Sequence, residues 1–354
     1  MKLLFKYTIL GLLCFVYSCS SSQDQTSKQY ADVDFKRIAF YNVENLFDIY
    51  NDSLTNDDEF TPEGERNWNN KRFYHKLNNI YRVIIGMGEW NPPVIVGLSE
   101  VENRFVLNKL VYQTPLKTFD YKIIHEESPD RRGIDVALIY RSSQFVPIEH
   151  HTVGIRFPFD TASRTRDILY VKGVLSEKDT VHVFVNHWPS RYGGYLVTKP
   201  KREFVASVLR KEIDSLYLVD YDPNIIIMGD FNDEPWDESV MNELNAKMDT
   251  LKLQSNDLFN LMSRYQKDWD GGTNKYQEDW GIIDQFIVSA NLISGKQNLQ
   301  ILNKSAIVYS PEFLLEEDFK YLGKKPFRTY VGFSYNRGYS DHLPIYIDLI
   351  SSEE

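Results

Sequence analysis

Cysteine is nearly absent from this 354-residue chain, which contains only Cys14 and Cys19. Both cysteines lie within the first 19 residues, so the remaining chain cannot form disulfides among its own residues. It also cannot use a thiolate nucleophile or bind zinc through cysteine. Any catalytic or metal-binding chemistry beyond the first 19 residues must therefore rely on oxygen and imidazole groups.

Positive charge is also scarce. The chain has 40 Lys and Arg residues against 50 Asp and Glu residues, a formal net charge of −10. Proteins that hold nucleic acid through a broad basic surface gain most of their affinity from Lys and Arg, and this composition argues against that class. A bound divalent cation can supply positive charge locally, so the composition does not exclude a phosphodiester substrate.

Long hydrophobic runs are confined to the N-terminal segment. Lys2 and Lys6 precede an apolar run over residues 7–17, the pattern of an export signal peptide. The run is too short to span a bilayer, which requires about 20 apolar residues. We therefore predict that the protein is exported.

Cys19 follows Val-Tyr-Ser and resembles the lipidated cysteine of a bacterial lipobox. We predict a lipoprotein signal peptide over residues 1–19 and a polar, flexible tether over residues 20–34. The protein would then be anchored in a lipid bilayer, in the periplasm or at the outer membrane or cell surface. The alternative is an ordinary secretory signal that is cleaved near Ser18 or Ser20.

Internal repeats, low-complexity blocks and Pro/Gly-rich linkers are absent between residues 35 and 350, which favours one domain. Short β-type runs alternate with stretches of helical periodicity, the pattern of a layered α/β domain. The expected helices are 71–86, 101–112 and 199–217. The expected strands are 37–42, 94–98, 121–125, 135–140, 181–186, 225–228, 285–288 and 345–350.

Polar side chains stand at the ends of several predicted strands, where ligand sites of α/β sheets form. Strand alternation places Asn42 and Glu44 on one face, although Asn after a strand is usually a turn residue. Glu100 follows a strand but also suits the first turn of a helix. A lone His187 is more often structural. Each of these signals is weak by itself.

The run Gly229-Asp230-Phe231-Asn232-Asp233 is a more specific signal, because a carboxylate and an amide at the tip of a buried strand require partners. Gly229 permits a close approach of the backbone. Near the C-terminus, Asp341 and His342 are adjacent, so their side chains should point to opposite sides. Asp341 can then face a metal while His342 turns toward a carboxylate, for which Asp284 is the candidate.

Six short motifs together resemble the endonuclease/exonuclease/phosphatase superfamily, in the order found in that family: NVEN, SEVEN, NHWPSR, GDFND, IIDQF and SDHLPI. The resemblance covers residues 35–350. It implies a deoxyribonuclease I-like α/β fold, a four-layer sandwich of two packed mixed β-sheets flanked by helices. It also implies a phosphoester hydrolase that uses Mg²⁺, with Mn²⁺ as an alternative.

The resemblance implies a role for each matching residue. Arg166 matches a phosphate-binding arginine, and Arg191, shortly after a site strand, is a second candidate for substrate binding. Metal-site positions fall at Asn42, Glu44, Glu100 and Asp341. Catalytic positions fall at His187, Asp230, Asn232, Asp284 and His342.

The expected reaction is in-line attack of water on phosphorus by a monomeric enzyme. The first hypothesis is an endonuclease that acts on DNA or RNA. The second is a phosphatase or phosphodiesterase for a small or lipid-linked phosphoester, which suits the acidic composition. A third, from another class, is a surface lipoprotein that binds ligands without catalysis.

Overall fold

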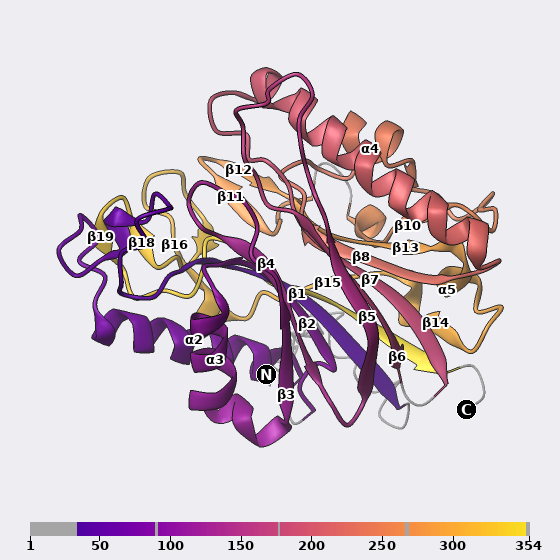
Figure 1. Ribbon diagram of the computed structural model, residues 1–354, viewed down its shortest axis with the longest axis horizontal. Helices are drawn as coiled ribbons and strands as arrows, with labels where there is room; N and C mark the ends of the chain where they lie inside the picture. Colours follow the sequence, from indigo (N-terminus) through magenta and orange to yellow (C-terminus); the bar gives the residue numbers. More distant parts are fainter. Residues whose placement is uncertain (1–33, 89–90, 176–177, 266–268, 352–354) are drawn as a thin grey trace, which may run out of the picture. The chain divides into compact units, whose positions relative to one another are not determined.

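Two seven-stranded β-sheets form the centre of the fold in the computed structural model (Figure 1). The structure describes residues 34–88, 91–175, 178–265 and 269–351, and the described residues from Phe35 onward form one compact unit. The predicted signal peptide and nearly all of the predicted tether lie outside the described residues. Among the described helices, none combines the length and apolar character needed to cross a membrane.

The first sheet, sheet A, has the order β14-β20-β1-β2-β4-β3, with β15 also paired to β20. β1 runs parallel to β2 and antiparallel to β20, so the sheet is mixed. Its strands are β1 (Phe35–Leu46), β2 (Ile95–Val101), β3 (Tyr121–His125), β4 (Asp135–Arg141), β14 (Leu299–Ile301), β15 (Ile307–Val308) and β20 (Ile345–Ser351).

The second sheet, sheet B, has the order β5-β6-β7-β8-β13-β10-β9. β7 and β8 are parallel, whereas β13 is antiparallel to β8. Its strands are β5 (Phe145–Val153), β6 (Ile168–Leu175), β7 (Asp179–His187), β8 (Asn224–Asp230), β9 (Ala246–Lys247), β10 (Leu258–Asn260) and β13 (Asp284–Ser289).

The main core lies between the two sheets. Along β8, Ile226 and Met228 belong to the core shared with sheet A, whereas Ile225 and Ile227 belong to a second core on the other face. Side chains alternate across a strand, so a strand buried on both faces requires a continuous apolar run. The sequence of β8 meets that requirement, and the strand was predicted for this reason.

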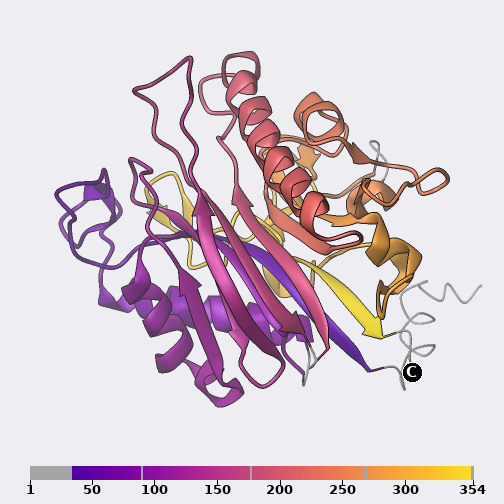
Figure 2. The ribbon, with the colours of Figure 1, turned by 45° about the vertical axis from the view of Figure 1, so that its right-hand side comes forward.

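Helices cover the outer faces of both sheets (Figures 1 and 2). α2 (Asn70–Gly88) and α3 (Arg104–Gln113) pack on the sheet A side, and α4 (Tyr195–Val219) packs its apolar residues against sheet B. The layers are therefore helix, sheet, sheet and helix, which confirms the predicted fold class. In the described part of the chain, the remaining α-helix is α5 (Ala290–Ser294), and the short 3₁₀ and π elements are Asp58–Phe60, Pro115–Phe119, Ser239–Glu243, Leu261–Arg264, Leu302–Lys304 and Glu312–Leu314.

Over the residues that the structure describes, three small hairpins lie outside the two sheets. They are β11 (Asn274–Tyr276) with β12 (Asp279–Gly281), β16 (Leu315–Glu317) with β17 (Lys324–Pro326), and β18 (Tyr330–Val331) with β19 (Ser334–Tyr335).

The strands β5 and β6 were absent from the sequence prediction. β5 is an edge strand of sheet B whose central residues are exposed, the apolar Val146 and Ile148 as well as the polar residues that follow, and its pairing shifts register between Pro147 and Glu149. Proline cannot donate to a sheet ladder and is tolerated at edges and bulges. The resulting sequence has neither the apolar run nor the regular alternation that signals a strand.

Candidate active site

The predicted site residues come together where the strands of both sheets end. Asn42 and Glu100 lie near the carboxyl ends of the parallel strands β1 and β2. His187 and Asp230 end the parallel strands β7 and β8, and Asp284 begins the antiparallel strand β13. Because β13 is antiparallel, its first residue lies at the same edge of the sheet as the last residues of its neighbours.

Asp230 is at the centre of this arrangement. It is the register partner of His187 on one side and of Asp284 on the other. Asn42 reaches it from sheet A, with Nδ2 donating a hydrogen bond of 3.0 Å to Asp230 Oδ2. Burial raises the pKa of the Asp230 carboxyl to about 7, and the nearby Asp284 charge adds to that increase, while His342 opposes it.

His342 and Asp284 form a buried pair, as the sequence predicted. His342 Nδ1 lies 2.7 Å from Asp284 Oδ2, and its Nε2 lies 3.8 Å from Asp230 Oδ2. Burial lowers the pKa of His342, but Asp284 and Asp230 outweigh it and hold that pKa well above the usual value. The Ser340 hydroxyl accepts a hydrogen bond from the His342 backbone N–H, which orients this segment.

The close approach of β7 and β8 depends on Gly229. A Cβ atom at this position would lie 2.4 Å from the carbonyl oxygen of Asn186. Only glycine therefore lets the two strands carry His187 and Asp230 side by side, as expected from the sequence.

Glu100 is directed into the site by a β-bulge. The pairing of β2 with β4 shifts register between Ser99 and Val101, and Glu100 has a positive φ of 62°. Bulges re-aim side chains in this way. Glu100 Oε2 accepts a hydrogen bond of 2.9 Å from the Asn45 backbone N–H, and Oε1 lies 3.9 Å from His187 Nε2. The alternative position in the first turn of a helix is wrong, because α3 begins only at Arg104.

His187 stands between the two sheets. Its Nε2 is 3.5 Å from Asp230 Oδ2, and its Nδ1 is buried without a hydrogen-bond partner in the described structure. Burial holds the pKa of His187 well below its usual value, and Arg166 and Arg132 lower it further. The imidazole is therefore neutral near pH 7, with one nitrogen able to accept and the other able to donate.

Asn232 does not simply continue the strand face that carries Asp230. Its φ is 51°, and its backbone N–H donates 2.9 Å to Asp230 Oδ1. Its side-chain Nδ2 donates 3.1 Å to the carbonyl oxygen of Trp188. The tip of β8 therefore turns on itself, and Asn232 links Asp230 to the strand end that carries His187.

Glu44 departs from the expected strand alternation. The backbone of β1 has positive φ at Glu44 and Asn45, and the pairing with β2 shifts register beyond Asn42. The Asn42 side chain accepts a hydrogen bond from the Glu44 N–H, which forms a local turn. As a result, Glu44 does not share the Asp230-facing position of Asn42, and its carboxylate meets Arg328 and Lys76 instead.

Arg328 joins the two other predicted metal-site carboxylates. Its Nε lies 3.3 Å from Glu44 Oε1, and a terminal nitrogen lies 3.0 Å from Asp341 Oδ2. Lys76 Nζ, with a fully buried side chain, lies 3.8 Å from Glu44 Oε2. Burial would raise the pKa of the Asp341 carboxyl, but Arg328 and then His342 hold it below its usual range. The sequence signal that was overlooked is Lys76 itself, a lysine among the apolar helix positions Phe73, Leu77 and Ile80.

The two predicted substrate-binding arginines are both engaged in ion pairs. Arg166 is buried, 3.0 Å from Asp130 Oδ2, and donates 2.6 Å to the carbonyl of Trp188. Arg191 donates 2.7 Å to the carbonyl of Asn232 and pairs with Asp237 at 2.7 Å. Both arginines thus support the loops that carry His187 and Asn232.

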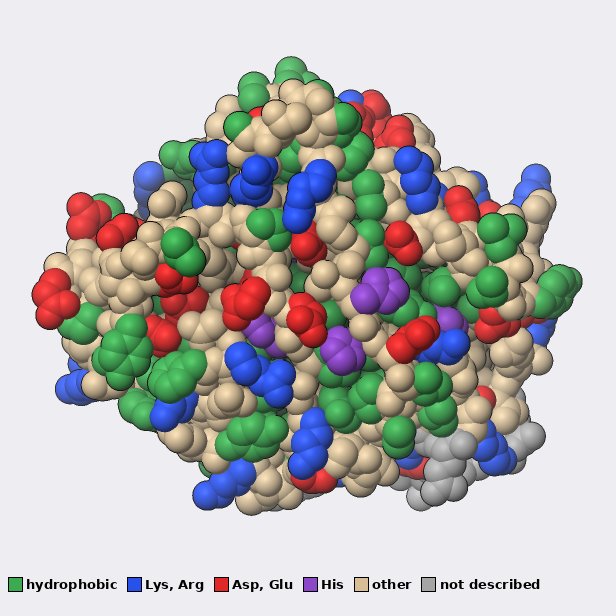
Figure 3. Space-filling view, in the orientation of Figure 1, with side chains coloured by type: hydrophobic (Ala, Val, Ile, Leu, Met, Phe, Trp, Pro, Cys, Tyr) green, Lys and Arg blue, Asp and Glu red, His purple; other side chains and the backbone are tan. Residues whose placement is uncertain are grey.

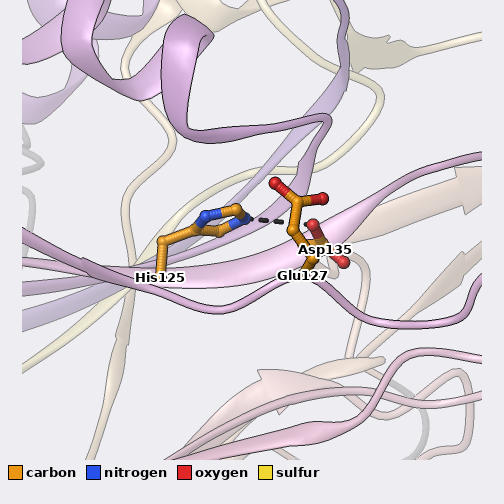
Figure 4. Close-up of side chains that lie close together, drawn as sticks. All are labelled: His125, Glu127 and Asp135. Carbon is orange, nitrogen blue, oxygen red and sulfur yellow. Dashed lines mark hydrogen bonds and ion pairs between the residues drawn. The ribbon is translucent and has the colours of Figure 1, made fainter. Parts of the chain in front are cut away.

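A second cluster lies at the ends of β3 and β4, where His125, Glu127 and Asp135 lie close together (Figure 4). His125 Nε2 is 3.0 Å from Asp135 Oδ2, and the Ser128 backbone N–H and hydroxyl both donate to Asp135 Oδ1. Both oxygens of Asp135 are thus already bonded. The cluster explains the local turn and requires no ligand.

The site has the donor chemistry for a hard divalent cation. Asp230, Asp284 and His342 offer ligand atoms within 4.8 Å of one another, Glu100 adds a carboxylate, and the Asn42 amide oxygen, which accepts the Glu44 N–H, keeps a second lone pair. Oxygen ligands of this kind suit Mg²⁺. The residues present therefore fit a metal-dependent phosphoester hydrolase.

Solved structures of known proteins share this fold. Human nocturnin with bound sulfate has a TM-score of 0.52 at 15% identity, covering 90% of this chain and 95% of that chain. D. rerio TDP2 complexed with a single-strand DNA product has a TM-score of 0.52 at 14% identity, and the match covers 89% of this chain and 98% of the TDP2 chain. A Bacteroides thetaiotaomicron mannosyl-6-phosphatase has a TM-score of 0.52 at 14% identity, and the match covers 89% of this chain and 99% of the phosphatase chain. No curated protein sequence matches the chain.

A family model agrees with the fold. The model described as "Endonuclease/Exonuclease/phosphatase family" matches residues 37–351, which include every residue discussed at this site. Enzymes of this family use divalent metals, and the acidic groups around Asp230 are able to hold one. This protein is therefore a phosphoester hydrolase of the endonuclease/exonuclease/phosphatase family.

Proposed function

We propose that this protein is a Mg²⁺-dependent phosphodiester hydrolase of the endonuclease type. The observation that carries the proposal is the position of Asp230, within 3.0 Å of Asn42, 3.5 Å of His187 and 3.8 Å of His342. These groups come from both sheets and surround one point. A phosphoryl group there would meet hydrogen-bond donors, a carboxylate and a cation site together.

Each residue has a specific task in this mechanism. Glu100 and Asn42 would hold Mg²⁺, which supplies positive charge toward a phosphoryl oxygen when bound. Asp230 orients the attacking water, which displaces the leaving oxygen in line. Asp284 holds Nδ1 of His342, so that Nε2 faces the reaction centre. The raised pKa keeps this imidazole protonated, so it stabilises the charged phosphorane, and Asp230, with a pKa of about 7, accepts the proton of the water that it orients. His187 and Asn232 contact the non-bridging oxygens.

Cationic side chains beside the site support a polyanionic substrate. Arg132 is close enough to His187 to lower its pKa, and its side chain is 46% exposed. Arg328, beside Asp341, is 43% exposed. Figure 3 shows several Lys and Arg side chains in a row on one face of the molecule. A nucleic acid strand could place flanking phosphates against exposed cationic side chains such as Arg132 and Arg328.

A small phosphoester is the second candidate substrate. A pocket of about 410 Å³ adjoins the site at Asp341 and Arg328, and Lys275, Tyr276 and Tyr321 also line it. That volume suits a sugar or nucleotide rather than a polymer. The shared fold with a mannosyl-6-phosphatase is compatible with this candidate, and the shared fold with a DNA-binding TDP2 is compatible with the first.

A phosphoester panel distinguishes the two candidates. Plasmid nicking that requires Mg²⁺, stops with chelator and weakens steeply with salt would support the endonuclease. Phosphate release from small substrates alone would support the second candidate. Asp230→Asn and His342→Ala should each abolish most activity, whereas Asp279→Asn, which changes an exposed acid on β12, should not. If both site variants hydrolysed at nearly the wild-type rate, this site would not be the active site.

We also propose that the enzyme is exported and lipid-anchored through Cys19. The sequence pattern of residues 1–19 supports this proposal. In a bacterial host, the Cys19→Ser variant should lose labelling by radioactive palmitate and should no longer be attached to membranes. The Cys14→Ser variant should keep the labelling and the membrane attachment. Equal labelling of the two variants would refute Cys19 as the anchor.

A further inference from the structure

Two of the four predicted metal-site residues share one guanidinium group. Arg328 contacts Glu44 Oε1 through Nε at 3.3 Å and Asp341 Oδ2 through a terminal nitrogen at 3.0 Å. The other oxygen of Glu44 accepts a hydrogen bond of 2.6 Å from the Thr329 backbone N–H. Both oxygens of Glu44 are therefore already bound by donors from the segment that carries Arg328.

The charges in this part of the site are balanced. Glu44 and Asp341 carry negative charge, and Arg328 and the buried Lys76 carry positive charge, at 3.0 to 3.8 Å. A divalent ion placed between the carboxylates would meet two resident cations and no net negative charge. Coulomb repulsion at such distances opposes its entry.

The charges around Glu100 are different. Among the described residues, the ion pairs within 4.0 Å of Glu100, Asp230 and Asp284 are all with His187 and His342. Three carboxyl groups thus meet two imidazoles and no Lys or Arg side chain at these distances. No cation of the chain occupies this part of the site, which leaves it open to a divalent ion.

We infer that Arg328 is a built-in cation that fills the space between Glu44 and Asp341, so that the protein binds one divalent metal ion per chain. Glu100 and Asn42 hold that ion, whereas Glu44 and Asp341 hold Arg328. The inference rests on the proposed metal-dependent function. It differs from the sequence-based expectation, which assigned all four residues to metal. The guanidinium is tethered to the chain, so chelators cannot remove it.

Metal stoichiometry tests the inference without any measurement of activity. Purified protein is titrated with Mn²⁺, and free Mn²⁺ is followed by electron paramagnetic resonance. We expect one Mn²⁺ per wild-type chain and two per Arg328→Ala chain, with the second ion bound more weakly because Lys76 remains. Arg328→Lys should bind one ion, because the charge is kept. The double variant Arg328→Ala/Asp341→Asn should again bind one Mn²⁺ per chain.

Controls separate the possible failures. Arg210→Ala removes another arginine paired with a carboxylate, Asp214 on α4, and should leave the stoichiometry unchanged. Circular dichroism and thermal unfolding establish that each variant is folded. Two ions in the wild-type chain, or one in Arg328→Ala, would overturn the inference while the proposed function stands. A wild-type chain that binds no Mn²⁺ would overturn both.

Discussion

Replacement of Asp284 by asparagine tests the pairing that orients His342. The two groups are 2.7 Å apart and buried, and asparagine preserves the size of the side chain while it removes the charge. A hydrogen bond to a charged group contributes about 1.5–3 kcal/mol. Each 1.36 kcal/mol changes a rate tenfold, so loss of this interaction in the transition state should lower kcat roughly 10- to 160-fold.

The assay is steady-state hydrolysis of the best substrate from the phosphoester panel, with saturating Mg²⁺. KM should change little, because Asp284 acts on the histidine and not on the substrate. The pKa of His342 should fall, because Asp284 is the main group that raises it against burial. Asp279→Asn serves as the matched control on the exposed β11–β12 hairpin. A kcat within threefold of wild type in a folded Asp284→Asn variant would refute the role assigned to this pair.

Three further predictions concern the metal, acid stability and a buried ion pair. Glu100→Gln should weaken Mn²⁺ binding by at least about tenfold in the same paramagnetic resonance titration; unchanged affinity would exclude Glu100 as a ligand. Burial lowers the pKa of His182 to about 4, so the unfolded state binds its proton more tightly and stability is lost as the pH falls from about 6.5 toward 4. Between pH 7 and 4.5, the free energy of unfolding measured with urea should therefore fall by up to about 2 kcal/mol less in His182→Gln than in wild type. An equal fall in both proteins would contradict this reasoning. Arg166→Ala removes the buried partner of Asp130, which keeps only the half-exposed Arg132 side chain at 3.7 Å and the Arg132 backbone N–H, and should lower the free energy of unfolding by about 3 kcal/mol, whereas Arg132→Ala, at an exposed side chain, should change it by less than about 0.5 kcal/mol.

The sequence was informative wherever a local pattern had only one physical solution. Residues 225–228 are apolar at every position, and such a run is stable only in a strand buried on both faces, as β8 is. The polar residues that follow it could only lie at the sheet edge. Gly229 was expected to permit a close approach, and the contact with Asn186 explains why no larger residue fits.

Local patterns were less informative where the backbone departs from regular geometry. Glu44, Asn45, Glu100 and Asn232 all have positive φ, which non-glycine residues rarely adopt without support from their surroundings. Strand alternation predicts the wrong direction for Glu44 for this reason. The edge strand β5 was missed because an exposed edge imposes little hydrophobic pattern on its sequence.

By itself, the sequence determined the layered α/β architecture and the strand ends that carry polar groups. Both follow from periodicity, burial and the alternation of side chains, which act over a few residues. Asp284 was only the candidate partner of His342, 58 positions away, and the resemblance to the family implied the pair. Only the tertiary structure decided that Arg328 meets Glu44, a residue 284 positions away in the chain. It also decided that, among the described residues, the ion pair of Glu100 within 4.0 Å is with His187 and not with a Lys or Arg. Charge compensation acts through space, and the distances that control it exist only after the two sheets have packed together.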